Sequence, residues 1–257
     1  MKYRRLSRRG WIRLAMCSVP AVVVADAAVI EPRWIRVRRL RLGGNEPAAR
    51  FVHFTDLHHK GNRSFLETMV AKINRLEPGF VCFTGDIVED VEFLAEALEG
   101  LREIKAPVYG VPGNHDYWCH ADFDEIERAL AATGGGWLLD RTAAPPGGRV
   151  QVAGASCRHP FALAPKAGVR NVALIHYPSW VENLRPHRFD VVLAGHSHGG
   201  QVRLPWIGSL VRPYGVEGFD LGLFETPAGP LYVGAGIGWF CLNVRFLCRP
   251  ELTLVEV

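Results

Sequence analysis

Residues 51–58 read FVHFTDLH, an apolar run that ends in an aspartate and a histidine. Two later stretches have the same form, because residues 80–86 read FVCFTGD and residues 107–116 read PVYGVPGNHD. Short apolar runs bounded by glycine and polar residues are typical of buried strands. Each of these three expected strands therefore delivers polar side chains of the metal-ligand type at its carboxyl end.

Segments with helical spacing separate the expected strands. Apolar residues recur three and four positions apart within 65–76 and within 91–104, and Asp122 is placed to cap a third helix that runs to about residue 132. Alternation of strands and helices at this spacing predicts right-handed βαβ units and a parallel sheet. In such sheets ligands bind beyond the carboxyl ends of the strands, so we expect the polar residues to share one edge.

The second half of the chain is richer in expected strands. Two of them end in candidate ligands, one at His176 and one at the run GHSH that spans 195–198. The expected strands cover 137–139, 150–153, 172–175, 191–194, 201–204, 222–225, 231–233 and 252–257.

Length and charge set limits on the domain organisation and on the partners. A chain of 257 residues that is 48% hydrophobic fits one α/β domain, which we expect to span 31–257. Residues 1–27 carry six positive charges and one negative charge, so subtracting their +5 from the net +4 leaves −1 for the remainder. Nucleic acid is therefore not an expected partner, because its binding requires a basic surface on the folded domain.

Residues 1–30 are predicted to be a signal or a membrane-anchor segment. Residues 1–13 are rich in arginine, and the apolar stretch 14–30 is interrupted by Pro20 and Asp26 and is short for a span of about 20 residues. The run SRRGWI at 7–12 resembles a twin-arginine export signal, and Ala-Asp-Ala at 25–27 resembles a cleavage site. An uncleaved anchor that binds anionic headgroups is the alternative. Both interpretations predict association with the inner membrane, and neither decides on which side of the membrane the protein lies.

Five separate strand ends deliver aspartate, asparagine or histidine to one expected edge, which chance explains poorly. A two-metal site holds ions about 3.5–4 Å apart, and a carboxylate that bridges them offsets their repulsion. Mixed imidazole and oxygen ligands favour manganese, iron, zinc or cobalt over calcium or magnesium. The candidate ligands are Asp56, His58, Asp86, Asn114, His176, His196 and His198.

In their order along the chain, these motifs resemble those of the calcineurin-like metallophosphoesterase family. The resemblance runs from about residue 50 to the C-terminus and rests on Asp56-x-His58, Gly85-Asp86, Gly113-Asn114-His115-Asp116, His176 and Gly195-His196-x-His198. It implies an α/β fold that is a four-layer α/β/β/α sandwich, with two mixed sheets flanked by helices. It also implies a hydrolase that uses two divalent metal ions.

The resemblance also implies a role for each motif residue. By position, Asp56, His58, Asp86 and His198 would bind one ion. Asp86 would bridge to a second ion, completed by Asn114, His176 and His196. His115 would stabilise the phosphate and protonate the leaving oxygen. Glu89 stands where the family has the aspartate that orients this histidine, so its partner is either Glu89 or Asp116.

The run HSHGGQVRLP at 196–205 resembles a bacterial branch of the family whose members often carry a twin-arginine signal or a membrane anchor. Some relatives are phosphodiesterases, and one cleaves the pyrophosphate of UDP-2,3-diacylglucosamine. We therefore expect a small-molecule or lipid phosphoester as the substrate. Protein Ser/Thr phosphatases match less well, because residues 85–90 read GDIVED rather than G-D-x-x-D-R-G.

Two rival functions follow from the same residues. A catalytically inactive metal-binding scaffold for protein contacts should lack the catalytic histidine or several ligands, whereas His115 and the full set are present. A nuclease should have a basic cleft, and the near-neutral body gives no support for one. A hydrolase of a phosphodiester or pyrophosphate bond is the function that the sequence favours.

Overall fold

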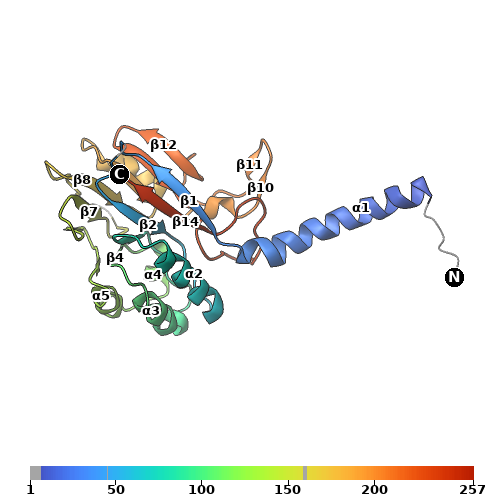
Figure 1. The fold of residues 1–257 in the computed structure, drawn as a ribbon, viewed down its shortest axis with the longest axis horizontal. Helices are drawn as coiled ribbons and strands as arrows, with labels where there is room; N and C mark the ends of the chain where they lie inside the picture. The colour runs from blue at the N-terminus through green and yellow to red at the C-terminus, as the bar shows by residue number, and fades with distance from the viewer. Residues whose placement is uncertain (1–6, 45, 159–160) are drawn as a thin grey trace.

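Two six-stranded sheets pack face to face in the computed structural model, which describes residues 7–44, 46–158 and 161–257 (Figure 1). The first sheet has the strand order β1 (Arg36–Arg41), β14 (Glu251–Glu256), β2 (Arg50–Phe54), β3 (Val81–Phe83), β4 (Val108–Gly110) and β5 (Gly136–Trp137). The second has the order β12 (Gly222–Thr226), β13 (Gly229–Val233), β9 (Val191–Ala194), β8 (Arg170–Leu174), β7 (Val150–Gly154) and β6 (Arg141–Ala143).

Both sheets are mixed, as the family resemblance implied. Strands β2 to β5 are parallel, whereas β14 runs antiparallel to β2 and parallel to β1. In the second sheet β13, β9, β8 and β7 are parallel, and the edge strands β12 and β6 are antiparallel to their neighbours. The C-terminal strand thus lies inside the first sheet, beside the strand that ends at the Asp56 motif.

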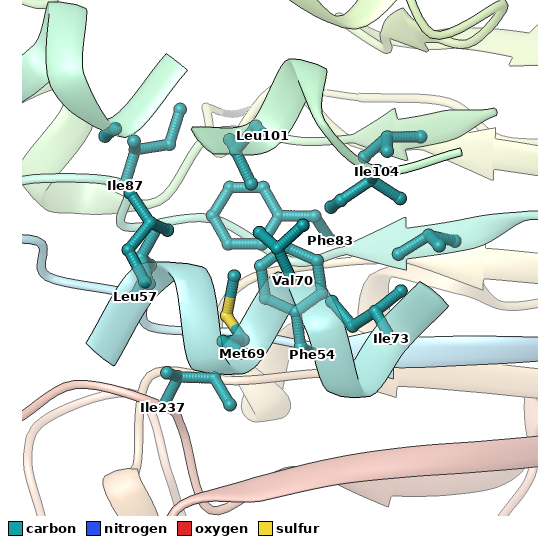
Figure 2. Packing of buried hydrophobic residues seen from close by; sticks show 14 of the residues in the cluster. Phe54, Leu57, Met69, Val70, Ile73, Phe83, Ile87, Leu101, Ile104 and Ile237 are labelled. Atoms are coloured by element: carbon teal, nitrogen blue, oxygen red, sulfur yellow. The ribbon is translucent and has the colours of Figure 1, made fainter. Parts of the chain in front are cut away.

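Three helices cover the outer face of the first sheet: α2 (Arg63–Arg75), α3 (Leu94–Arg102) and α5 (Phe123–Ala131). Side-chain oxygens of Asn62 and Asp122 accept hydrogen bonds from the first-turn amides of α2 and α5, which satisfies donors that the helices leave free. Figure 2 shows Met69 and Val70 of α2 packed over Phe54 and Phe83, whose rings stack at 4.7 Å.

The molecule has one core between the helices and the first sheet, and a second core between the two sheets. Successive side chains along a strand point to opposite faces of the sheet, so neighbouring residues belong to different cores. Phe51 belongs to the inter-sheet core, where its ring stacks on Phe80 at 4.6 Å, whereas Val52 belongs to the core under the helices. Outside the second sheet, η4 (Pro178–Leu184) buries Val181 and Leu184. The predicted four-layer sandwich is confirmed, with a 3₁₀ helix and loops rather than α-helices as its outermost layer.

Several short elements differ from the prediction. The expected helix over 91–104 divides into η3 (Val91–Phe93) and α3. The short helix α4 (Asn114–Trp118) was not predicted. The expected strand 201–204 is confined to β10 (Arg203–Leu204), which pairs with β11 (Gly208–Ser209) in a separate two-stranded ribbon outside both sheets. The turn η5 (His198–Gly200) leads into this ribbon.

The N-terminal segment forms α1 (Arg8–Ala25), η1 (Asp26–Ile30) and η2 (Glu31–Arg33), and α1 projects away from the sandwich (Figure 1). Ala27 contacts the body, since its carbonyl oxygen accepts a 2.9 Å hydrogen bond from the amide of Arg245. The buried Glu31 carboxylate accepts hydrogen bonds from the amides of Leu247 and Cys248. The predicted boundary between residues 30 and 31 therefore falls within a region of contact. Among the described residues, no helix has both the length and the apolar character needed to cross a membrane.

Candidate metal centre

The candidate ligands lie at the carboxyl ends of five strands drawn from both sheets. Asp56 follows β2, Asp86 follows β3, Asn114 follows β4, His176 follows β8 and His196 follows β9. Hydrogen bonds from a backbone amide to a side chain link the loops of the two sheets here, because the His196 amide donates to both carboxylate oxygens of Asp56 at 3.0 Å. The structure therefore brings the predicted residues of the two halves of the chain to one place.

Several candidate ligands have a backbone in the left-handed region of φ. Five of the seven candidate ligands have a φ between 40° and 66°: Asp56, His58, Asp86, His196 and His198. A positive φ is uncommon outside glycine, although aspartate and histidine tolerate it better than most residues. Each such residue costs about 1–3 kcal/mol, so the surrounding structure must hold these side chains in place.

The first group of ligand atoms comes from Asp56, His58 and His198, which lie within 4.8 Å of one another. The Nε2 atoms of His58 and His198 are 3.1 Å apart, and His198 Nε2 is 3.6 Å from Asp56 Oδ1. Two buried imidazole nitrogens that face each other require a proton or a cation between them. The donor set of two nitrogens and a carboxylate fits a divalent transition-metal ion.

The second group consists of Asp86, His176 and His196, again within 4.8 Å of one another. His176 Nδ1 lies 2.7 Å from the Thr84 carbonyl oxygen, so it carries the proton and leaves Nε2 free to face Asp86 and Asn114 Oδ1, the latter at 3.0 Å. His196 Nε2 contacts the Tyr214 carbonyl oxygen at 2.8 Å, which leaves Nδ1 for the site. These contacts with carbonyl oxygens fix both rings in the tautomer that a metal ligand needs.

Asp86 lies between the two groups. Its Oδ2 atom is 3.4 Å from His58 Nε2 and 3.3 Å from His176 Nε2. Its other oxygen accepts a 2.8 Å hydrogen bond from the His115 amide, which fixes the carboxylate. One carboxylate oxygen thus faces both groups, which is the arrangement that a bridging ligand needs.

The electrostatics of the site favour positive charge. Burial raises the pKa of Asp56 to about 6. Burial also acts to raise the pKa of Asp86, but the imidazoles of His176 and His58 outweigh it and hold that pKa well below its usual range. Burial acts to lower the pKa values of His58 and His176, but Asp86 outweighs it and raises both to about 9. The same carboxylates that attract protons to these imidazoles would attract divalent cations in their place.

His115 lies beside the first group, at the start of α4. Its ring centroid is 4.8 Å from that of His58, 4.8 Å from that of Trp118 and 5.5 Å from that of Phe240. Burial lowers the pKa of His115, because aromatic neighbours replace water around the ring. The structure therefore places the predicted catalytic histidine next to the ligands without making it part of either ligand group around Asp86.

The two carboxylates considered as partners of His115 have different surroundings. Asp116 is fully buried and accepts hydrogen bonds from the amides of Asp86, Ile87 and Gly113 at 2.8–2.9 Å, so it holds the loops together. Glu89 instead forms a cluster with His58 and His115 in which the ligand atoms lie within 4.8 Å of one another. Of the two, Glu89 is the carboxylate that faces the imidazoles.

Sequence reasoning missed Arg245, which is completely buried behind Asp56. Its guanidinium donates hydrogen bonds to the carbonyl oxygens of Ala235, Gly238 and Cys248. The Gly238 amide in turn donates to the Asp56 carbonyl oxygen at 2.7 Å. Arg245 therefore supports the loop behind the first group. Its position in a loop far along the chain gave no local signal of this role.

Residues 49–200, more than half of the chain, match the calcineurin-like phosphoesterase family. The chain belongs to this family. As a calcineurin-like phosphoesterase, it is a metallophosphoesterase, a hydrolase with buried histidine and aspartate groups that are suited to metal binding.

Several bacterial proteins are similar to this phosphoesterase over most of their length. The uncharacterized metallophosphoesterase YkuE of Bacillus subtilis is 26% identical over 225 residues, which cover 80% of this chain and 77% of that one. The phosphodiesterase YaeI of Escherichia coli is 27% identical over 246 residues, 88% of this chain and 90% of that one. The UDP-2,3-diacylglucosamine pyrophosphatase LpxG of Chlamydia trachomatis is 25% identical over 310 aligned residues, 93% of this chain and 94% of that one.

Solved structures also resemble this phosphoesterase. A dimetal phosphatase from Danio rerio aligns with a TM-score of 0.48 and 12% identity, and the alignment covers 75% of this chain and 88% of that one.

Proposed function

We propose that this phosphoesterase binds two divalent ions and hydrolyses a phosphodiester or pyrophosphate bond. The observation that carries the proposal is the position of Asp86, whose Oδ2 atom lies 3.3–3.4 Å from an imidazole of each group. One ion would be held by Asp56, His58 and His198, and the other by Asn114, His176 and His196, with Asp86 shared between them. Manganese, iron or zinc suits these nitrogen and oxygen ligands.

When bound, such ions supply Lewis-acid activation of water and neutralise charge on the phosphoryl group. His115 lies beside the first group, where it would hydrogen-bond the substrate and donate a proton to the leaving oxygen. Burial lowers the pKa of free His115, and an anionic phosphoryl group next to the ring would raise it again. Protonation of His115 is therefore coupled to substrate binding.

The surroundings of His115 support a substrate with an apolar part. The rings of Trp118 and Phe240 contact His115 and are both exposed, so they form an aromatic rim next to the site. Exposed aromatic side chains beside a polar centre suit an amphiphilic phosphoester, and the near-neutral charge of the body disfavours a nucleic acid. The names of two relatives, a phosphodiesterase and a UDP-2,3-diacylglucosamine pyrophosphatase, make lipid-linked diesters and nucleotide-sugar pyrophosphates the substrate classes to test.

A substrate panel tests the proposal. Purified protein loaded with manganese should hydrolyse bis-p-nitrophenyl phosphate or UDP-2,3-diacylglucosamine in preference to p-nitrophenyl phosphate, and chelation should abolish the activity. A strong preference for the monoester would overturn the assignment of bond type. Full metal content without hydrolysis of any substrate would favour the scaffold alternative, which the presence of His115 and all seven candidate ligands argues against.

We also propose that residues 1–25 determine location and not chemistry. The exposed side chains of α1 include the basic Arg8 and Arg9 and the apolar Met16, Val19 and Val22–Val24, as in segments that associate with inner-membrane lipids. Replacement of Arg8 and Arg9 by lysine separates the two mechanisms, since twin-arginine export needs the guanidinium pair and an electrostatic anchor needs only positive charge. Fractionation of cells that express this variant distinguishes export from electrostatic anchoring. Fully soluble wild-type protein in the cytoplasm would contradict both mechanisms.

A further inference from the structure

The β10–β11 ribbon ends in a group of exposed apolar side chains. Trp206 is fully exposed at its turn, Ile207 is 66% exposed and Val211 is 68% exposed. Such neighbouring large apolar residues are costly on a surface that contacts only water, and they mark interaction sites. The ribbon lies outside both sheets, so these side chains contribute little to the cores of the sandwich.

One loop links the ribbon to the segment that follows α1. The Arg203 amide donates a 2.9 Å hydrogen bond to the carbonyl oxygen of Phe246. The Gln201 side chain donates to the carbonyl oxygen of Leu242 at 3.0 Å. The loop that contains these two partners also binds Ala27 and Glu31, and it exposes Leu242 by 70%. Figure 1 shows the ribbon on the side of the sandwich from which α1 leaves. We call the exposed apolar residues within 29–30, 206–211 and 242–247 the apolar collar.

The accessible charge around the collar is mainly positive. Besides the buried Arg245, residues 201–216 and 237–250 contain three solvent-accessible arginines, Arg203, Arg212 and Arg249, and neither aspartate nor glutamate; residues 8–25 also lack acidic residues. The body as a whole is close to neutral, so acidic residues are concentrated elsewhere on it. Of the neighbouring carboxylates, Asp220 is paired with Arg203 and Arg212, and Glu31 is buried. An apolar surface with an excess of accessible arginines matches a bilayer with anionic headgroups, where tryptophan is favoured at the interface.

We propose that the apolar collar inserts into the surface of a lipid bilayer with anionic headgroups and brings the metal centre next to the membrane. The loop of the collar carries Phe240, whose ring centroid is 5.5 Å from that of His115, and the ribbon leads to Tyr214, whose carbonyl oxygen contacts His196. Insertion of the collar therefore places the aromatic rim of the site near the headgroups. This inference extends the proposed function, since it supplies a membrane contact separate from α1 and explains access to an amphiphilic substrate.

Vesicle binding by the full-length protein tests the collar. The double variant Trp206→Ser/Ile207→Ser should lower the partition coefficient onto phosphatidylglycerol–phosphatidylcholine vesicles by roughly tenfold or more, because two apolar side chains no longer leave water. The matched control is Val91→Ser/Leu223→Ser, which removes two exposed apolar side chains outside the collar and should bind as wild type does. In vesicles with brominated lipid, wild-type fluorescence should be quenched more than that of Trp206→Phe.

Equal binding by wild type and the ribbon variant, or equal quenching of wild type and Trp206→Phe, would overturn the proposal. If the wild-type protein did not bind vesicles but formed dimers, and the ribbon variant was monomeric, the collar would instead be a protein interface. Turnover of bis-p-nitrophenyl phosphate without vesicles should be the same in wild type and the ribbon variant. Because binding is measured without substrate, failure of the proposed reaction would leave the lipid result unaffected.

Discussion

The Oε1 atom of Glu89 lies 3.2 Å from Nδ1 of His58. The opposite ring nitrogen of His58 faces the site, 3.1 Å from His198 Nε2 and 3.4 Å from Asp86 Oδ2. Burial acts to raise the pKa of Glu89, but His58 and Lys60, whose Nζ is 2.9 Å from Glu89, outweigh it and lower that pKa to about 2. Glu89 is therefore a carboxylate anion that orients an imidazole toward the first ligand group.

Replacement of Glu89 by glutamine should weaken binding at the first group, because the amide carries no charge to orient His58. Loss of such a partner typically lowers metal affinity by about 10–100-fold. Calorimetric titration with manganese measures the change, and excess metal should restore most of the activity. The control is Glu96→Gln, since Glu96 lies 3.6 Å from the neighbouring His59, which belongs to neither ligand group. Unchanged affinity in Glu89→Gln would show that the ring is held by its packing alone.

Asp86→Ala should remove both ions, whereas His198→Ala should weaken mainly one. The physical reason is that Asp86 Oδ2 faces His58 and His176, while His198 contacts residues of the first group only. Elemental analysis of the purified variants gives the metal-to-protein ratio, and circular dichroism checks that each is folded. Full metal content in a folded Asp86→Ala protein would refute the bridging role.

His115→Asn should lower turnover by roughly 10²–10⁴-fold, the usual scale for general acid catalysis, while metal content stays near that of wild type. Asparagine keeps the backbone amide that donates to Asp86, so the ligand groups should remain intact. The loss should shrink for substrates with acidic leaving groups, since those leave without a proton. A loss of the same size for every leaving group would point to electrostatic stabilisation instead.

The buried His53 should make the apoprotein less stable in acid. Burial lowers its pKa from 6.5 to about 3, and Nε2 lies 2.9 Å from the Thr84 hydroxyl oxygen. Between these pH values the unfolded chain binds a proton that the folded chain excludes. The free energy of unfolding should therefore fall by about 1.4 kcal/mol for each pH unit below 6.5, with no loss from this group at higher pH.

Denaturant unfolding of metal-free protein at pH 7 and pH 5 measures this dependence. The variant His53→Gln, which cannot titrate but can still reach Thr84, should show a smaller loss than wild type. His187→Gln, which removes an exposed histidine, serves as the control and should behave as wild type does. Identical losses in wild type and His53→Gln would mean that other groups dominate the acid sensitivity.

The fold of the first half could be predicted from the sequence because its signals are local. Strand β2, helix α2 and strand β3 follow directly from the apolar runs and helical spacing between residues 51 and 83. The order of the βαβ units then fixes which strand ends share an edge. The candidate ligands after β2, β3 and β4 were predictable for this reason.

Other features depend on contacts that no local pattern specifies. Asp116 adjoins His115 in sequence, yet the turn of α4 directs its carboxylate to the amides of Asp86, Ile87 and Gly113. Glu89, 26 positions before His115, is the carboxylate that faces the imidazoles. The sequence left these two alternatives open, because adjacency along the chain does not say which way a side chain points.

By itself, the sequence determined which residue types leave the strand ends and therefore which chemistry the edge of the sheets can support. Only the tertiary structure decided how they combine. The second sheet stacks on the first so that His176 reaches Asp86 and His198 reaches His58, and Arg245 closes the loop behind Asp56. The reason is physical. Periodicity along the chain sets the face on which each side chain is buried, whereas the packing of two sheets depends on apolar surfaces contributed by residues far apart in sequence.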